Sequence, residues 1–358
     1  MIEFNQNSAD NTSVTYLLQL CTIVFLGYLV LGISFGTLPG FITKSLHYNS
    51  LVVGIVLGIQ SFATLVTRHL SGTLCDTKGS KRSVIIGLLF FIGTGIFYLL
   101  SCSSIKQHIV SISLLVAARI LLGFGESFLI TGALSWGIGL MGVKSSGKVM
   151  AWNGIAMYGG LAFGAPLGIA IQDNLSLGYA FVGVLFFPAL ALAIAYVLKA
   201  VAPLGTLRVP FYTVVKSIWK QGTALAMSAI GFSVIASFIT LYFAQQHWQN
   251  ASLSLTVFGL TYIIARIPFA HYPDKYGGKK VGIFSLTIEV AGLLCLCFAA
   301  SYSMALFAVA LTGAGFSLVF PSLGVEAVKE VAPQNRGAAL GAYAAFFDLA
   351  LGNRGLNN

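Results

Sequence analysis

Arg119 and Glu126 lie seven residues apart within the apolar run 110–141, where ionisable side chains are rare. At 3.6 residues per helical turn, this spacing puts both side chains on one face of a helix. Apolar surroundings favour the neutral form of a carboxyl group, whereas a nearby arginine favours its anion. A carboxyl group balanced in this way can take up and release a proton, so we expect both residues to take part in proton coupling. A structural ion pair between helices is the alternative.

A second set of charged residues forms a short element that occurs twice in the chain. The first copy comprises Arg68, Gly72, Asp76, Gly79, Lys81 and Arg82, and the second comprises Arg266, Ala270, Asp274, Gly277, Lys279 and Lys280. In both copies the arginine precedes the aspartate by eight residues. Each copy follows one long apolar run and precedes another, which predicts a duplicated membrane protein. An aspartate at such a junction can accept hydrogen bonds from the amides of a helix N-terminus, although the charges could also serve only to set the topology.

The composition sets the surroundings in which these residues must work. Only 8% of the residues are charged and 57% are hydrophobic, and the mean hydropathy is +0.89, whereas a soluble domain carries about 25% charged residues. We therefore expect an all-α polytopic protein whose main partner is the lipid bilayer. The net charge of +10 does not indicate nucleic-acid binding, because the basic residues are spread over short loops.

Apolar runs of about 20 residues mark the expected membrane spans. We expect spans at 15–38, 51–73, 83–101, 110–141, 148–171, 177–199, 219–244, 252–273, 281–300 and 303–324, and the start of an eleventh at 337–352. The loops after the even-numbered spans hold most of the loop lysines and arginines, whereas the odd-numbered loops hold only Lys44 and Lys106. Basic loops stay in the cytoplasm, so we expect the N-terminus there as well.

Three motifs in this chain resemble those of the major facilitator superfamily of secondary transporters, and more narrowly of its bacterial drug and arabinose efflux-type members. The motifs are Gly72-x-Leu-x-Asp76-x-x-Gly79-x-Lys81-Arg82, Arg119-Ile-Leu-Leu-Gly123-Phe-Gly125 and Gly159-Gly-Leu-Ala-Phe-Gly164-Ala-Pro166-Leu-Gly168. The resemblance implies a fold of two pseudo-symmetric six-helix bundles. We expect the second bundle to be incomplete, because the eleventh span is short and is followed by a polar end. We expect a truncated chain on this ground.

The resemblance also implies roles for these motifs. The repeated element would latch the two halves in the outward-facing state, with Asp76 as the latch acid and Arg68 as its partner. The second motif is linked to proton coupling in the family. The third, which includes Gly160, Gly164, Pro166 and Gly168, resembles the antiporter motif of proton-driven exporters, with Ala165 where the family usually has glycine.

A central cavity for the substrate is also implied by the family. Asp348, in the eleventh span, corresponds to Tyr158 in the first half, and both would face this cavity if they obey the pseudo-symmetry. We expect Asp348 to join the proton-coupling residues, and Asn153, Tyr158 and Tyr242 to contact the substrate. For Asn153 and Tyr158 a hydrogen bond between helices is an equal alternative. Glu289 is expected at a helix contact outside the cavity.

The sequence lacks the residue patterns needed for nucleotide binding, metal binding or nucleophilic catalysis. The segment Gly142-Val-Lys-Ser-Ser-Gly147-Lys148-Val149 falls short of a phosphate-binding loop at its last position. The cysteines and histidines have no metal-binding spacing, and no nucleophilic triad can be assembled. We therefore expect no enzyme activity, no metal and no cofactor.

These observations predict two halves, 1–199 and 219–358, joined by a cytoplasmic linker at 200–218. The predicted function is secondary transport by alternating access, with protons driving export of a small molecule such as a drug, sugar or metabolite. We expect a monomer in a bacterial inner membrane. The alternative is a truncated, transport-inactive fragment or a membrane interaction protein.

Overall fold

The computed structural model describes residues 3–203, 209–248 and 252–352, and most of these residues are helical. The helices are α1 (Glu3–Gly40), α2 (Ser50–Lys78), α3 (Ser80–Ser103), α4 (His108–Met141), α5 (Ser146–Asn174), α6 (Leu177–Val197), α7 (Phe211–Gln245), α8 (Ser252–Phe269), α9 (Tyr272–Tyr276), α10 (Gly278–Cys297), α11 (Tyr302–Lys329) and α12 (Arg336–Gly352). A π-helical turn follows α1, and short 3-10 turns precede α5 and α12. At least eight helices in the described ranges are long and apolar enough to cross a membrane. The predicted polytopic all-α fold is confirmed.

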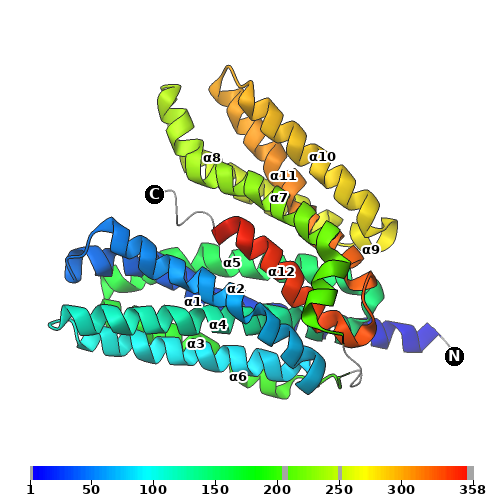
Figure 1. Ribbon diagram of the computed structural model, residues 1–358, viewed down its shortest axis with the longest axis horizontal. Helices are drawn as coiled ribbons and strands as arrows, with labels where there is room; N and C mark the ends of the chain where they lie inside the picture. Colours follow the sequence, from blue (N-terminus) through cyan, green and yellow to red (C-terminus); the bar gives the residue numbers. More distant parts are fainter. Residues whose placement is uncertain (1–2, 204–208, 249–251, 353–358) are drawn as a thin grey trace.

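The helices form two groups that repeat the same packing. In the first group α1 packs on α5 and α3 on α4, and in the second group α7 packs on α12 and α10 on α11. Figure 1 shows α1–α6 together on one side and α7, α8, α10 and α11 on the other, with α5 and α12 where the groups meet. Contacts of α12 with α2, and of α5 with α11, join the two groups.

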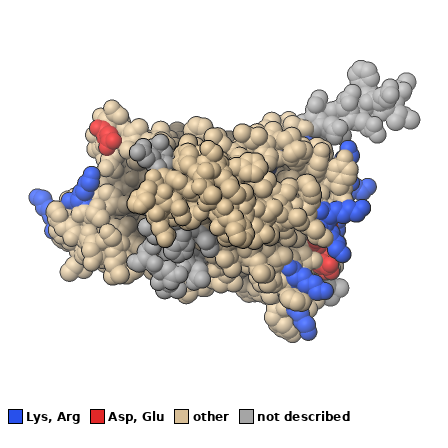
Figure 2. Space-filling model, turned by 90° about the horizontal axis from the view of Figure 1, so that it is seen from above, with Lys and Arg blue, Asp and Glu red and all other residues tan. Residues whose placement is uncertain are grey.

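The outer surface shown in Figure 2 has its lysines and arginines at the two ends of the molecule, and other residues make up the visible middle. The larger group of basic residues lies at the end that is also nearest α9 and the N-terminus in Figure 1. We call it the basic end. The described residues in the middle of this face show no exposed charge, which suits the hydrocarbon core of a membrane.

The two copies of the charged element adopt the same backbone turn. Gly79 separates α2 from α3 with φ +92°, and Gly277 separates α9 from α10 with φ +90°. Glycine adopts this conformation without the steric penalty of a side chain. Two neighbouring helices can therefore follow each other with almost no loop, at equivalent corners of the two groups.

The connection between the halves is shorter than the predicted linker at 200–218. Helix α7 begins at Phe211, and its first turns bury Val214 and Ile218 against α11 and α12. Apolar residues at helical spacing thus continue the membrane helix into the segment that we expected to be a linker.

Candidate functional site

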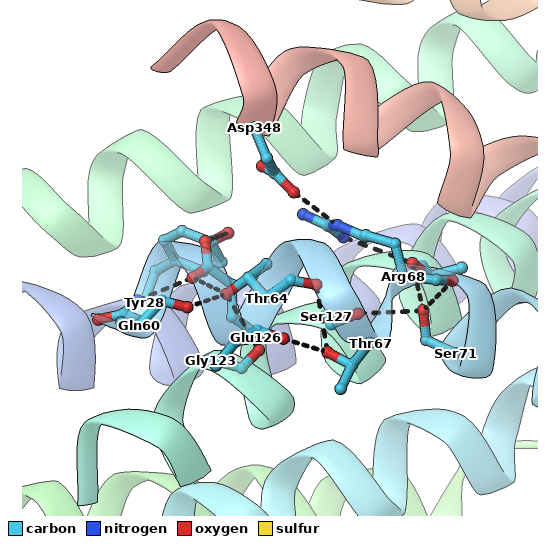
Figure 3. A network of polar contacts seen from close by, with 12 residues as sticks. Tyr28, Gln60, Thr64, Thr67, Arg68, Ser71, Gly123, Glu126, Ser127 and Asp348 are labelled. Atoms are coloured by element: carbon cyan, nitrogen blue, oxygen red, sulfur yellow. Dashed lines mark hydrogen bonds and ion pairs between the residues drawn. The ribbon is translucent and has the colours of Figure 1, made fainter. Parts of the chain in front are cut away.

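Glu126 lies on α4 and is held by three donors from two other helices. The hydroxyl of Tyr28 on α1 donates to its Oε1 over 3.1 Å. On α2, Gln60 Nε2 and Thr64 Oγ1 donate to its Oε2, over 2.8 and 3.3 Å. Figure 3 shows these side chains converging on the carboxyl group. All three donors are uncharged, so no cation bonds directly to Glu126 among the described residues.

Arg68, one turn further along α2, forms an ion pair with Asp348 on α12. Arg68 Nε lies 2.8 Å from Asp348 Oδ2, and both side chains are largely buried. In Figure 3 Asp348 points from α12 toward α2, across the boundary between the two halves. Our prediction that Arg68 partners Asp76 is wrong, because eight residues of helix put about 12 Å between them.

A chain of hydroxyl groups extends this polar site within the first half. Arg68 Nη1 contacts Thr131 Oγ1 at 3.4 Å, and Ser71 Oγ donates to the same oxygen over 3.1 Å. Ser127, the neighbour of Glu126 on α4, donates to Ser71. The arginine is therefore fixed by both α4 and α12, and its charge interacts with Glu126 as well as with Asp348.

Contrary to our expectation, Arg119 does not pair with Glu126. Its side chain is fully buried, Nη2 donates to the carbonyl oxygen of Leu57 over 3.1 Å, and its guanidinium lies 5.3 Å from the ring centre of Phe35. Within the described ranges it forms no ion pair. The spacing placed both residues on one face of α4, but nearly two turns separate them, and Glu126 is closer to donors on α1 and α2.

A cavity of about 500 Å³ lies between the halves and brings the charged residues to one space. Arg68, Glu126, Arg266 and Asp348 all line it. Its remaining walls include Tyr28, Ser61, Asn153, Gly154, Met157, Tyr158, Phe232, Tyr262, Phe316, Phe320, Ala344 and Phe347. The predicted cavity residues Asn153 and Tyr158 are thus present. Tyr242 is elsewhere, because its hydroxyl reaches the carbonyl oxygens of Leu296 and Ala299 near the end of α10.

The second half supplies an aromatic wall to this cavity. Phe316 stacks on Phe232 with ring centres 5.4 Å apart and on Phe347 with centres 6.5 Å apart. Tyr262 meets Phe316 at 5.9 Å and Tyr158 of α5 at 4.8 Å. The second half thus offers flat apolar surfaces to the cavity, beside the charged side chains of Arg266 and Asp348.

The two aspartates of the repeated element reach across to the opposite half at the basic end. Asp76 accepts hydrogen bonds from the backbone amides of Gly337 and Ala338, over 2.7 and 2.8 Å, at the start of α12. Asp274 accepts equivalent bonds from Gly147 and Lys148, over 2.8 and 2.7 Å, at the start of α5. Each carboxylate opposes the positive end of a helix dipole. The structure thus brings both predicted latch acids to the boundary between the halves.

Burial distinguishes the two aspartates. Asp76 is 8% exposed, and a Cβ on Gly72 would come within 2.8 Å of Ala338 Cα, so α2 and α12 touch closely there. Asp274 is half-buried, and its burial raises its pKa, against the opposing effect of the amides of Gly147 and Lys148.

The basic residues of the first copy have different surroundings. Lys81 Nζ donates to the carbonyl oxygens of Tyr196 and Leu198 at the C-terminal end of α6, over 2.8 and 2.6 Å. A lysine there caps unpaired carbonyl groups and opposes the negative end of the helix dipole. Arg82 and, in the second copy, Lys279 are exposed.

The glycines of the third motif bring α5 against α1. A Cβ on Gly164 would come within 2.5 Å of the carbonyl oxygen of Leu29, and one on Gly160 within 2.6 Å of that of Phe25. Gly168 packs in the same way on Ile33, whereas Pro166 is exposed on the other face. The motif is therefore a close contact between helices, of the kind that small residues permit in membranes.

Comparison with known proteins identifies the family to which this architecture belongs. The family model of the Major Facilitator Superfamily matches residues 20–352. The chain belongs to this superfamily. Its relatives include a protein named as an MFS-type transporter in Salmonella typhimurium, with 41% identity over 345 residues that cover 96% of this chain and 89% of the relative. The superfamily chain is thus a multi-pass membrane transporter rather than an enzyme.

Solved structures share the fold of this superfamily chain at low sequence identity. The fucose:proton symporter of E. coli matches with a TM-score of 0.80 and 14% identity, covering 96% of this chain and 90% of that one. The human organic anion transporter MFSD10 matches with a TM-score of 0.78 and 17% identity, covering 96% and 92%. At these identities the likeness concerns the fold alone.

Several contacts at the site had no clear signal in the sequence. Tyr28 is one of many aromatic residues in apolar spans, and Gln60 stood out only as a polar residue within a span. Glu289 is buried, and Ser228 on α7 donates to its Oε2, which agrees with the expected helix contact outside the cavity. No group of three or more metal-binding side chains occurs in the part of the chain that the structure describes.

Proposed function

We propose that this transporter exports a small molecule by alternating access, in exchange for protons. The observation that carries the proposal is the position of Glu126 on the cavity wall, close to the Arg68–Asp348 ion pair. The described residues that donate hydrogen bonds to Glu126 are all neutral. A buried carboxyl group in such surroundings can exist as acid or anion at modest cost in either form. Proton uptake and substrate binding can therefore affect each other within one cavity.

The proton step that we propose acts on the contact between the halves. When Asp348 takes up a proton, it loses its negative charge and Arg68 loses its ionic partner on α12. The guanidinium then has Glu126 as its remaining nearby carboxylate. Release of the proton restores the pair, so protonation weakens one link between α2 and α12. Arg119 serves as a positioning residue, because it ties α4 to Leu57 of α2.

The two aspartate contacts at the basic end support the conformational part of the proposal. Asp76 and Asp274 bond each half to a helix start of the other. We propose that the basic end faces the cytoplasm of a bacterial cell, with the N-terminus on that side of the inner membrane. These contacts then close the cavity toward the cytoplasm, and the transporter works as a monomer whose two halves rock about the cavity.

Transport into liposomes tests this proposal. Purified protein is reconstituted with the pH dye pyranine inside, a proton gradient is imposed, and three radiolabelled solutes are offered: L-arabinose, ethidium and hippurate. We expect at least one solute to move only with the gradient, together with protons in the opposite direction. Glu126→Gln should abolish this movement, whereas the exposed Lys106→Gln should not. Equal flux with and without the gradient, or with Glu126→Gln, contradicts proton coupling. No flux of any solute favours a membrane interaction protein.

A further inference from the structure

Arg266 on α8 is the second-half counterpart of Arg68, and the two arginines differ in what neutralises them. Arg68 pairs with Asp348. The residue that corresponds to Asp348 in the first half is Tyr158, which carries no charge at neutral pH. Arg266 forms no ion pair with any carboxylate in residues 3–203, 209–248 and 252–352. The duplication has thus kept both arginines but only one counter-ion.

Arg266 as a whole residue is 1% exposed, and it lines the cavity. Its guanidinium stacks over the ring of Tyr262 at 4.3 Å, and Nη2 donates to the carbonyl oxygen of Ser317. Nη1 lies against Gly154 of α5, where a Cβ would collide with it. Nε has no hydrogen-bond partner among the described residues. An arginine this deep in a membrane protein normally has a negative partner, because an isolated buried charge is costly.

The other charges of the cavity are already satisfied. Asp348 is neutralised by Arg68, and both oxygens of Glu126 accept hydrogen bonds from neutral donors. A cationic substrate would have to displace one of these partners. An anionic substrate would meet Arg266, which forms no ion pair among the described residues and still has a donor to offer, so this part of the cavity favours an anion.

The surroundings of Arg266 indicate the chemistry of the rest of the substrate. Tyr262 and Phe316 continue from the guanidinium into the aromatic wall formed with Phe232 and Phe347. Flat stacked rings bind an aromatic or apolar body, and an arginine matches the two oxygens of a carboxylate. We propose that the cavity binds organic carboxylates with an aromatic or apolar body, and that Arg266 supplies the counter-charge. This inference rests on the proposed transport function, because it names the class of solute carried.

Equilibrium binding of a matched pair of ligands tests the inference. Hippurate carries a carboxylate on an aromatic body, and hippuramide replaces that group with a neutral amide of nearly the same shape. Their dissociation constants are measured by calorimetry with the whole chain in nanodiscs of phosphatidylcholine. A second series with anionic phosphatidylglycerol shows whether a lipid headgroup competes for the same site. We expect hippurate to bind the wild type at least about 10-fold more tightly than hippuramide.

Three variants test whether the effect depends on Arg266. Arg266→Gln should weaken hippurate binding by about 30-fold or more, as expected when one partner of a buried charge pair is lost, and should change hippuramide binding little. Arg266→Lys should recover only part of the affinity, because an ammonium lacks the planar fork. Gly154→Ala removes no charge but crowds Nη1, so it should also weaken hippurate selectively. Retained hippuramide binding shows that each variant is folded, and the exposed Lys106→Gln serves as the control.

Several outcomes would overturn the inference. They are no binding of hippurate to the wild type, equal affinity for hippurate and hippuramide, and unchanged hippurate affinity in Arg266→Gln. Competition by phosphatidylglycerol alone would make Arg266 a lipid site instead. Transport of ethidium or L-arabinose with a proton gradient, without carboxylate binding, would retain the proposed function and reject the substrate class. Carboxylate binding through Arg266 without any gradient-driven flux would retain the binding of carboxylates and reject the proposed transport function.

Discussion

Arg68 and Asp348 form an ion pair with Nε 2.8 Å from Oδ2, although 280 residues separate them in the chain. The pair joins α2 of the first half to α12 of the second at the edge of the central cavity. A charge of the first half is thus neutralised by a charge of the second half. The pair is therefore suited to link proton uptake to the relative position of the halves.

Breaking this pair should cost stability, whereas replacing it whole should not. Asp348→Asn or Arg68→Gln alone leaves one charge buried without its partner, at a cost of about 3–5 kcal/mol. The double variant Arg68→Met with Asp348→Leu removes both charges and should recover most of the lost Tm. Transport should stay abolished in all three variants. The check is Tm by differential scanning fluorimetry, beside flux in liposomes. A double variant that transports would show that the pair is only structural.

Glu126→Gln should separate proton coupling from substrate movement. Glutamine keeps one acceptor oxygen, which can serve the amide of Gln60, and its own NH2 group can donate to the hydroxyl of Tyr28, but it cannot take up a proton. We expect gradient-driven flux to be lost, while exchange of labelled for unlabelled solute across the membrane continues.

The control for Glu126→Gln is Thr64→Val, which removes the longest of the three hydrogen bonds and leaves the carboxyl group in place. It should reduce gradient-driven flux by only a few-fold. Loss of exchange in Glu126→Gln would mean that Glu126 binds the substrate or supports the fold rather than coupling protons.

The sequence allowed the arrangement of helices to be predicted better than the partners of individual side chains. The repeat predicted equivalent positions for Asp76 and Asp274 in the two halves, because two similar units pack in the same way. The contacts of Arg68 depend on the rotation of a long helix, where one residue corresponds to about 100°. That rotation aims Arg68 into the cavity and away from Asp76. Within α4, Arg119 and Glu126 lie on one face but about 10 Å apart along the helix axis, so each side chain has separate partners on neighbouring helices.

The two aspartate contacts at the basic end should contribute unequally to transport. Asp76 is the more buried of the two, and Gly72 brings α2 into close contact with α12 beside it. Ala270 stands at the position of Gly72 in the second copy, and Asp274 is half-buried. We therefore expect Asp76→Asn to reduce flux more than Asp274→Asn, with a difference of several-fold. In the drier site of Asp76 one hydrogen bond from a backbone amide is lost and the other no longer has a charged acceptor.

The check is flux per molecule of reconstituted protein, with equal amounts of each variant in the liposomes. The exposed Lys279→Gln, near Asp274, serves as a control for loss of charge at the basic end. Equal effects of the two aspartate variants, or a larger effect of Asp274→Asn, would count against the ranking.

The pH dependence of the contact at Asp274 follows from its burial. Burial raises the pKa of this carboxyl group above its ordinary value of 3.8, so the proton binds more tightly here than in an exposed chain. A group whose pKa is raised on folding favours the folded state increasingly as the pH falls through that pKa. The folded, closed arrangement should therefore gain stability from Asp274 on acidification, and lose that gain as the pH rises.

The Tm difference between wild type and Asp274→Asn should move in favour of the wild type as the pH is lowered through the acid range. Lys275→Gln, an exposed neighbour, should follow the wild type at every pH. A difference that moves the other way would show that the amides of Gly147 and Lys148 outweigh burial and hold Asp274 as the anion.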